Sequence, residues 1–558
     1  VLPERDSLPG LVRLTAMLGL SGRSETTHEL PECVLGDGVG EAQVIIHKPS
    51  RKLLLNLNNP ERVLTVIPTA KVLQHQGHNI VVVPHQEDEV RVLRNLGFDT
   101  PAPIEHHYDF PGRFQPFIHQ KTTSAFLTTN PWSFCLNGMG SGKTISVLWA
   151  YDYLKSTGQA NRMLVVAPLS TLVRTWADEV FSNFPHLTSA VLHGTMDKRL
   201  KLLAVPHDIY IINHDGIKSP EMLKALEERK DIDVLVPDEL ASFRTAGTAR
   251  FKAMHRLVQG RKYVWGLTGT PTPNAPTDAW AQCKLIAPTK VPKYFGAFRD
   301  SVMKQITQFK WAPRESALEL VRNAMQPAIR FSREECIDLP PTLHQTREVD
   351  LTPEQKRAFD DMVRTFRAEY AGGQVVAVNE AVKMGKLVQI CCGTAYSATG
   401  DVVLPSKPRI EEVRDIIEEA DAKVIVFVPL TAALEHLAKE LSQHFSVEIV
   451  HGGTSKTERD RIFGAFQKQK DPRVLVANAA AMSHGLTLTA ANTIVWYAPP
   501  TSNEIYEQAN ARIVRPGQKL STLIVHIEST PLEAKMYDRL RKKGNMQGAL
   551  LEMLKGEK

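Results

Sequence analysis

The chain has 558 residues, of which 43% are hydrophobic and 23% are charged, and its net charge is +6. One hydrophobic core stops growing at about 250 to 300 residues, so this length predicts two large domains and a smaller part. No apolar run approaches the roughly 18 residues of a membrane span, and six cysteines without a Cys-x-x-Cys pair exclude a disulfide framework and a zinc ribbon. We therefore expect a soluble protein of a cytoplasm, and the positive charge is compatible with a polyanionic partner.

The first 105 residues begin with an irregular stretch and continue with a structured one. Residues 1–40 are rich in Gly, Pro, Ser and Glu and have no periodicity, which is typical of an irregular tail. Short apolar runs bounded by turn residues follow at 52–57, 63–67 and 80–83. Together with a helix-compatible stretch at 87–95, these runs predict a small α/β accessory module over residues 41–105.

Strand-like apolar runs then alternate with helical segments, which is typical of an α/β fold with parallel sheets covered on both faces. The first set of runs is 134–136, 163–167, 209–212, 234–236 and 264–267, and the second set is 424–428, 447–450, 473–477 and 493–497. We predict one lobe over residues 106–290, a proline-interrupted linker over 291–345, and a second lobe over 346–530. A helical insertion is expected at 353–395, and an amphipathic brace helix at 531–558.

The segment GMGSGKT lies between an expected strand and an expected helix. Glycines there allow backbone N–H groups to converge on phosphate oxygens, while Lys143 would neutralise β- and γ-phosphate charge and the Thr144 hydroxyl would ligate Mg²⁺. The strict pattern has glycine where this chain has Asn137. We predict an ATP-binding loop that binds the nucleotide through Gly138, Gly140, Ser141, Gly142, Lys143 and Thr144.

The segment VLVPDEL places two adjacent carboxylates at the end of an expected buried strand. Asp238 would hold Mg²⁺, and Glu239 would orient and deprotonate the attacking water. An isolated Asp-Glu pair is more often a solvated surface pair, but its position after a buried strand favours the catalytic interpretation.

A third motif, LTGTPTPN at 267–274, follows another expected strand. The three motifs in this order resemble superfamily-two helicases, and QANARIVRPGQ at 508–518 is similar to the Q-x-x-x-R-x-x-R-x-G-Q pattern of the Swi/Snf-type DNA translocases. Further segments fit this family: 165–180, 211–217, 424–441, 451–466 and 483–497. The phosphate-loop drift and the small amino-terminal module resemble the phage-encoded and HARP-like annealing helicase members.

The resemblance implies two tandem RecA-like lobes and a DNA-dependent ATPase that uses ATP and Mg²⁺. It implies that Arg512 and Arg515, on one helix face, reach the γ-phosphate held by the first lobe. It also assigns nucleotide contacts to Gln120 and Gln508, and coupling to Thr268 and Gly269. The family commonly has His where this chain has Ala241, and Asn where it has Thr487.

The partner implied by the resemblance is duplex or branched DNA, bound without sequence preference by a monomeric motor in a bacterial or phage-infected host cytoplasm. No membrane partner is expected. The candidate DNA contacts on motif loops are Ser170, Thr171, Thr454 and Thr489. Two alternatives stay open: an RNA or single-strand-tracking helicase, and an ATP-gated clamp that binds branched DNA without translocation.

Overall fold

The structure is a computed structural model. It describes residues 44–540 apart from the segments 76–77, 308–309, 337–339, 372–384, 398–399, 483–486, 501 and 516. The expected tail 1–40 and the part of the expected brace helix after residue 540 lie outside the described residues. The chain divides into two compact units, one of Val1–Pro131 with Ile145–Ala160, and one of Trp132–Thr144 with Asn161–Lys558.

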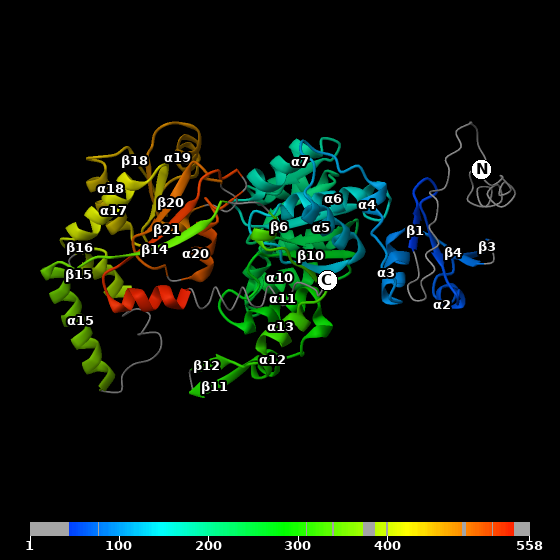
Figure 1. Ribbon diagram of the computed structural model, residues 1–558, viewed down its shortest axis with the longest axis horizontal. Helices are drawn as coiled ribbons and strands as arrows, with labels where there is room; N and C mark the ends of the chain where they lie inside the picture. Colours follow the sequence, from blue (N-terminus) through cyan, green and yellow to red (C-terminus); the bar gives the residue numbers. More distant parts are fainter. Residues whose placement is uncertain are drawn as a thin grey trace, which may run out of the picture. The chain divides into compact units, whose positions relative to one another are not determined.

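The first unit contains a four-stranded antiparallel sheet in the order β1-β2-β4-β3 (Figure 1). Its strands are β1 (Val44–His47), β2 (Lys52–Asn56), β3 (Lys71–His75) and β4 (His78–Pro84), followed by helix α3 (Glu87–Asn95). The apolar run at 63–67 begins instead in a short helix, α2 (Glu61–Leu64). Val63 and Ile67 are both buried in one core cluster, and the N–H of Ile67, just after the helix, donates to the Val63 carbonyl at 2.9 Å.

The same unit holds helices α4 (Ile104–His107) and α5 (Ile118–Thr129), and residues Ile145–Ser156 of α6 (Lys143–Ser156). Ser124 Oγ donates to the carbonyl of Ser146 at 2.9 Å, which joins α5 to α6. The Tyr108 hydroxyl donates to Asp152 at 2.5 Å. The first of these hydrogen bonds joins α5 to α6, and the second joins the residue after α4 to α6.

The second unit contains a seven-stranded, entirely parallel sheet in the order β13-β5-β10-β9-β6-β8-β7. Its strands are β5 (Trp132–Cys135), β6 (Arg162–Ala167), β7 (Ser189–Val191), β8 (Ile209–Asn213), β9 (Ile232–Pro237), β10 (Tyr263–Leu267) and β13 (Ala328–Ile329). Helices α9 (Pro220–Glu228), α10 (Ala249–Leu257) and α11 (Ala279–Ile286) pack their apolar residues into its core. The continuous apolar runs form strands because a parallel sheet covered by helices buries both faces.

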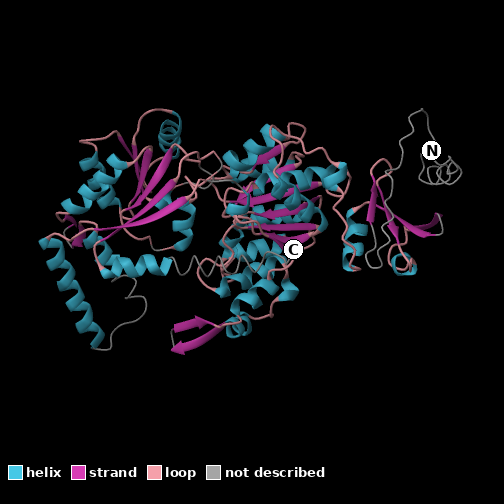
Figure 2. Cartoon of the chain, in the orientation of Figure 1, coloured by secondary structure: helices cyan, strands magenta, loops and turns pink. Residues whose placement is uncertain are grey.

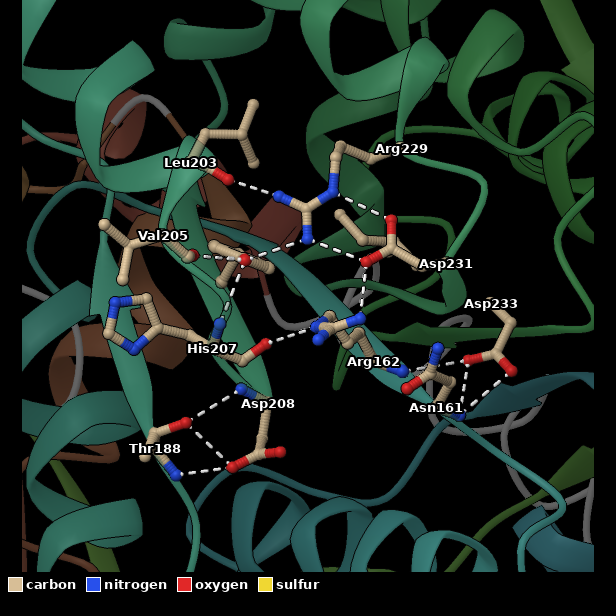
Figure 3. A network of polar contacts seen from close by, with 12 residues as sticks. Asn161, Arg162, Thr188, Leu203, Val205, His207, Asp208, Arg229, Asp231 and Asp233 are labelled. Atoms are coloured by element: carbon tan, nitrogen blue, oxygen red, sulfur yellow. Dashed lines mark hydrogen bonds and ion pairs between the residues drawn. The ribbon is translucent and has the colours of Figure 1, made fainter.

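A polar network fastens the amino ends of these strands (Figure 3). The Asp233 carboxylate accepts hydrogen bonds from the backbone N–H groups of Asn161 and Arg162. Asp231 accepts from Arg162 at 2.6 Å and from Arg229 at 2.8 Å. These hydrogen bonds and ion pairs fix the amino ends of the strands. The loops at the carboxyl ends carry the candidate functional groups.

A second parallel sheet follows in the order β14-β21-β20-β17-β19-β18. Its strands are β14 (Thr342–Glu348), β17 (Lys423–Phe427), β18 (Val447–Val450), β19 (Val474–Ala477), β20 (Ala491–Trp496) and β21 (Thr522–Glu528). One face packs on α17 (Lys407–Glu419) and α18 (Thr431–Leu441), and the other on α19 (Lys456–Lys468) and α20 (Asn503–Asn510). Figure 2 shows both parallel sheets as strands between helices, which confirms the predicted fold class of two RecA-like lobes.

The segment expected as a linker, 291–345, holds regular structure of its own. It contains α12 (Phe295–Val302), the hairpin of β11 (Met303–Thr307) and β12 (Lys310–Pro313), and α13 (Ala317–Ala324). It also supplies β13, the edge strand of the first sheet, and β14, the edge strand of the second.

The expected insertion at 353–395 begins with α15 (Pro353–Ala371). Residues 531–540, the first part of the expected brace helix, are helical. Arg409 of α17 pairs with Glu533 at 2.8 Å, and both side chains are buried. Among the helices of the described residues, none combines the length and the apolar character that crossing a membrane requires.

Two histidines meet in the first unit. His107 Nε2 lies 2.9 Å from His85 Nδ1, and His85 Nε2 lies 3.0 Å from the carbonyl oxygen of Pro101. Burial, together with the neighbouring charges of His85 and Arg51, lowers the pKa of His107 from 6.5 to about 4. The folded state therefore holds this imidazole neutral.

The pairing of His107 with His85 predicts that the folded protein loses stability in acid. A folded pKa below the unfolded value means that the unfolded chain binds more protons between pH 6.5 and pH 4, so its free energy of unfolding falls as the pH falls through that window. His107→Gln keeps an N–H donor but does not titrate, so its melting temperature should drop less between pH 7.5 and pH 5.0 than that of the native chain. Equal drops in the two proteins would contradict the assignment.

Candidate active site

Four loops at the carboxyl ends of neighbouring strands of the seven-stranded sheet carry the predicted phosphate, metal and coupling residues and two of the predicted DNA contacts. They follow β5, β10, β9 and β6, and they comprise residues 136–144, 268–270, 238–239 and 168–171. Because parallel strands end at the same edge of a sheet, these loops converge. The site is therefore built from segments that are far apart in the sequence.

The phosphate loop has the geometry that its glycines predict. Gly140 and Gly142 have φ values of 81° and 78°, a conformation that side chains with a Cβ atom rarely adopt. The Lys143 ammonium donates to the carbonyls of Asn137 at 2.9 Å and Gly138 at 3.1 Å. Ser141 Oγ also donates to the Gly138 carbonyl, at 2.9 Å. The lysine is thus held across the loop, where a nucleotide phosphate could accept from it.

Asn137, which departs from the strict motif, has a structural function. Its side-chain oxygen accepts a hydrogen bond from the backbone N–H of Phe331 at 2.9 Å. The N–H of Gly138 in turn donates to the Phe331 carbonyl at 2.9 Å. Glycine could supply only the backbone bond, so the asparagine fixes the start of the phosphate loop against the segment that follows β13.

Asp238 extends strand β9 beyond its last residue. Its N–H donates to the Val166 carbonyl at 2.8 Å, and it forms a parallel bridge with Leu267. Its two carboxylate oxygens are held separately, Oδ1 by the backbone N–H of Glu239 at 3.0 Å and Oδ2 by the indole N–H of Trp176 at 3.0 Å. Both donors are fixed in the fold, so the carboxylate has one defined orientation.

Glu239 adopts a left-handed backbone conformation with φ 51°, which is costly for a residue with a Cβ atom and is found mostly at functional sites. Burial, with smaller contributions from the charges of Asp238 and Glu504, raises the pKa of its carboxyl to about 7. Lys143 and Arg512 oppose this shift. A carboxylate with a pKa near neutrality is suited to accept a proton from water.

The same charges act on Lys143. Burial lowers the pKa of its ammonium, whereas the carboxylates of Glu239 and Asp238 raise it. Oxygen donors for Mg²⁺ are present in the Asp238 carboxylate and the Thr144 hydroxyl. A cation bound together with a nucleotide takes most of its ligands from phosphate and water, so two protein ligands are sufficient.

The LTGTP loop touches the phosphate loop. The N–H of Thr268 donates to the Cys135 carbonyl at 3.1 Å, and a Cβ atom on Gly269 would lie 3.2 Å from Met139 Cγ. Thr268 Oγ1 accepts from the N–H of Thr270 at 3.2 Å. A rearrangement of one loop would therefore displace the other, which is the arrangement that the predicted coupling role of Thr268 and Gly269 requires.

The two arginines of the last motif do not lie on a helix, so the prediction that they share one helix face is wrong. Helix α20 ends at Asn510, and both arginines lie in the turn after it. Arg512 is buried, and its charge lowers the pKa of Glu239. Arg515 is less buried and donates to Thr487 Oγ1 at 3.1 Å. The motif thus brings one guanidinium into electrostatic contact with the predicted general base.

Other predicted contacts occupy local hydrogen bonds. Gln120 Oε1 accepts from the N–H of Phe117 at 3.0 Å and caps helix α5, while Gln508 Nε2 donates to Glu504 at 3.4 Å. Among the predicted DNA contacts, the Thr171 hydroxyl donates to Pro168, Thr454 Oγ1 accepts from His451, and Thr489 Oγ1 accepts from Gln467. Ser170 is partly exposed. Their ligand contacts remain predictions.

Sequence reasoning missed two residues that hold Asp238. Trp176 lies in the segment 165–180 that resembles the family, but nothing in its spacing indicates an acceptor. His214 donates through Nε2 to the backbone carbonyl of Asp238 at 2.8 Å. Its position directly after strand β8, at the same sheet edge as Asp238, was the signal that could have found it.

Comparisons with known proteins agree with this arrangement. A family model described as an SNF2-related domain matches residues 133–395, and one described as a helicase conserved C-terminal domain matches residues 408–517. The first match contains the phosphate loop and both carboxylates, and the second contains both arginines.

The proteins that resemble this chain differ in how much of their own length it covers. Putative protein p41 of Acyrthosiphon pisum secondary endosymbiont phage 1 is 25% identical over 76% of this chain and 95% of p41. The DNA annealing helicase and endonuclease ZRANB3 of Mus musculus is 25% identical over 74% of this chain but 38% of its own length. A solved structure, the Sulfolobus solfataricus SWI2/SNF2 ATPase core in complex with dsDNA, aligns with 22% identity and a TM-score of 0.39 over 79% of this chain and 94% of that chain.

The fold, the site and the matched domains define an ATP-dependent enzyme of the helicase and translocase class. Within that class, the chain combines an SNF2-related domain with a helicase conserved C-terminal domain, in agreement with the Swi/Snf-type resemblance that the order of its motifs predicted. It spans nearly all of p41 but less than half of ZRANB3.

The site predicts separate effects on binding and on chemistry. Lys143→Ala should abolish nucleotide binding, because the ammonium is the phosphate-facing cation of the loop. Glu239→Gln should retain binding and lower hydrolysis by about 10²-fold or more, since it loses the proton acceptor. Fluorescent-nucleotide titration and phosphate release measure the two properties. Lys252→Ala, an exposed lysine of α10, is the control, and hydrolysis by Glu239→Gln at the native rate would refute the role of Glu239.

The arginines should act on turnover. Arg512→Ala and Arg515→Ala are each expected to slow hydrolysis by about 10³-fold while leaving the Kd for ATP nearly unchanged, as loss of a guanidinium that stabilises the transferring phosphoryl group does. The matched control is Arg461→Ala, which removes the ion pairs of an exposed α19 arginine with Glu458 of the same helix and Glu448 of β18. Native turnover in both arginine variants would exclude the role, and circular dichroism would verify that the buried Arg512 site still folds.

Proposed function

We propose that the chain hydrolyses ATP to move along duplex or branched DNA, where it would migrate branches, anneal strands or remodel forks. The observation that carries this proposal is an ion pair at 3.5 Å between Arg244, five residues after Glu239 at the carboxyl edge of the first parallel sheet, and Glu504 of helix α20 on the second. In the same direction, the charge of Arg512 lowers the pKa of Glu239. A site assembled from both sheets would make hydrolysis depend on their relative positions, and this dependence is how a two-lobed ATPase converts chemistry into movement.

Each residue has a role in this proposal. Lys143 neutralises the β- and γ-phosphates, Asp238 and Thr144 hold Mg²⁺, and Glu239 accepts the proton of the attacking water. When bound, Mg²⁺ would neutralise charge that develops on the phosphoryl oxygens. Arg512 and Arg515 stabilise the same charge, while Gln120 and Gln508 contact the nucleotide. Thr268 and Gly269 couple binding or loss of the nucleotide to movement, because their loop contacts the phosphate loop.

DNA would be bound through its backbone, by loop residues of both sheets: Ser170, Thr171, Thr454 and Thr489. Contacts of hydroxyl and amide groups with phosphates carry no sequence information, so binding would be independent of sequence and sensitive to salt. ZRANB3 is named a DNA annealing helicase, which supports annealing as the task, and the phage relative p41 supports a bacterial or phage-infected cytoplasm. We propose a monomeric motor.

A panel of nucleic acids tests the substrate. The ATPase rate should rise with duplex, forked and four-way DNA more than with single-stranded DNA or RNA, and Lys143→Ala should respond to none of them. A larger response to single strands or RNA would favour the single-strand-tracking alternative.

Translocation is tested by ATP-driven displacement of a third strand from a DNA triplex. The moving enzyme should release that strand only with hydrolysable ATP. DNA-stimulated hydrolysis without release would favour the ATP-gated clamp.

A further inference from the structure

The indole of Trp176 connects two parts of the first parallel sheet's functional edge. Trp176 lies in η1 (Leu172–Ala177), a π-helix that begins directly after the loop carrying Ser170 and Thr171. Its side chain has no exposed surface, and its Nε1–H donates to Asp238 Oδ2 at 3.0 Å. A buried indole N–H needs an acceptor, but here the acceptor is the carboxylate assigned to the metal.

The backbone fixes Trp176 to the preceding loop. The N–H groups of Thr175 and Trp176 both donate to the Thr171 carbonyl at 3.1 Å, and the second of these closes the wide turn of a π-helix. Thr171 is itself held to Pro168 through its N–H at 3.0 Å and its hydroxyl at 2.9 Å. A displacement of Thr171 would therefore shift the indole without an intervening flexible segment.

The neighbourhood of the carboxylates offers no equivalent link from the chain that follows them. Ala241 is buried and ends in a methyl group, which can neither donate nor accept a hydrogen bond. The backbone N–H of Glu239 orients Oδ1 but moves with Asp238 itself. Trp176 is thus a donor to the carboxylate that belongs to a different strand-to-loop connection.

We propose that Trp176 is a positioning residue that couples contact with DNA at residues 170–171 to the orientation of the Asp238 carboxylate, and so to metal binding. The coupling step rests on the proposed function, because it assumes that this loop meets DNA. The positioning step rests only on the hydrogen bond and the burial.

Trp176→Phe tests the positioning step, because it keeps an aromatic ring and removes the N–H. The matched control is Trp265→Phe in β10, another fully buried tryptophan, whose indole nitrogen has no hydrogen-bond partner among the described residues. Binding of Mn²⁺ in the presence of ADP, followed by electron paramagnetic resonance, reports on the carboxylate without turnover. Removing a group that orients a metal ligand typically weakens metal binding by about 10- to 100-fold, which is the shift expected for Trp176→Phe and not for Trp265→Phe.

The coupling step is tested by the ratio of ATPase rates with and without saturating duplex DNA. Trp176→Phe should lower this ratio several-fold while its Kd for duplex DNA stays native, and Trp265→Phe should keep both. Equal Mn²⁺ affinities in the two variants would overturn the positioning role. Weakened Mn²⁺ binding with a native stimulation ratio would overturn the coupling.

Two further outcomes are distinguishable. If no DNA stimulates the native enzyme, the proposed function and the coupling fail, while the Mn²⁺ comparison still decides the positioning role. If Trp176→Phe does not fold, 3-benzothienylalanine at position 176 replaces the N–H by sulfur at nearly constant shape. Native Mn²⁺ affinity in that variant would refute the proposal, and weakened affinity would support it.

Discussion

The structure depends on holding one ammonium and two carboxylates together, partly buried, at the carboxyl edge of a sheet. Burial by itself would favour the neutral form of each group. Lys143 and the carboxylates Asp238 and Glu239 offset that cost for one another, and the pKa of Glu239 near 7 shows the balance that results. Such a balance is sensitive to any added charge, so a triphosphate, a divalent cation or a guanidinium would change the protonation and position of these groups.

The contacts around this cluster of three charged side chains hold its members in place. Asn137 anchors the phosphate loop, Gly269 permits the LTGTP loop to approach it closely, and Trp176 orients Asp238. Each of these residues belongs to a different strand-to-loop connection. The positions of the charged groups are consequently fixed by the sheet as a whole. The register of the parallel strands and the polar network at their amino ends determine where each loop begins.

The second parallel sheet repeats the architecture but contributes different chemistry. Among the described residues, no phosphate loop follows any of its strands, and its part of the site comes from the turn after α20. Arg512 and Arg515 are held there by unlike contacts, since Arg512 is buried and Arg515 donates to Thr487. The position where the family commonly has Asn is occupied here by Thr487, whose hydroxyl accepts a hydrogen bond from Arg515 at 3.1 Å.

The sequence by itself determined the central strands of both sheets, because continuous apolar runs such as 163–167 and 424–428 are buried on both faces and leave a strong pattern. It also determined the phosphate loop and the paired carboxylates, whose chemistry requires particular residue types at fixed spacing. It did not reveal edge strands such as β14, which is mostly exposed, or β13, which has two residues, because short or solvated strands have no distinctive periodicity.

Only the tertiary structure decided which side chains act on one another across those segments. The run at 63–67 starts in a helix because residues four apart face the same core, and the two arginines lie beyond a helix that ends at Asn510. The hydrogen bonds of Trp176 and His214 with Asp238 join residues 62 and 24 positions apart. No local pattern encodes such pairs, because their partners are brought together by the order of strands in the sheet.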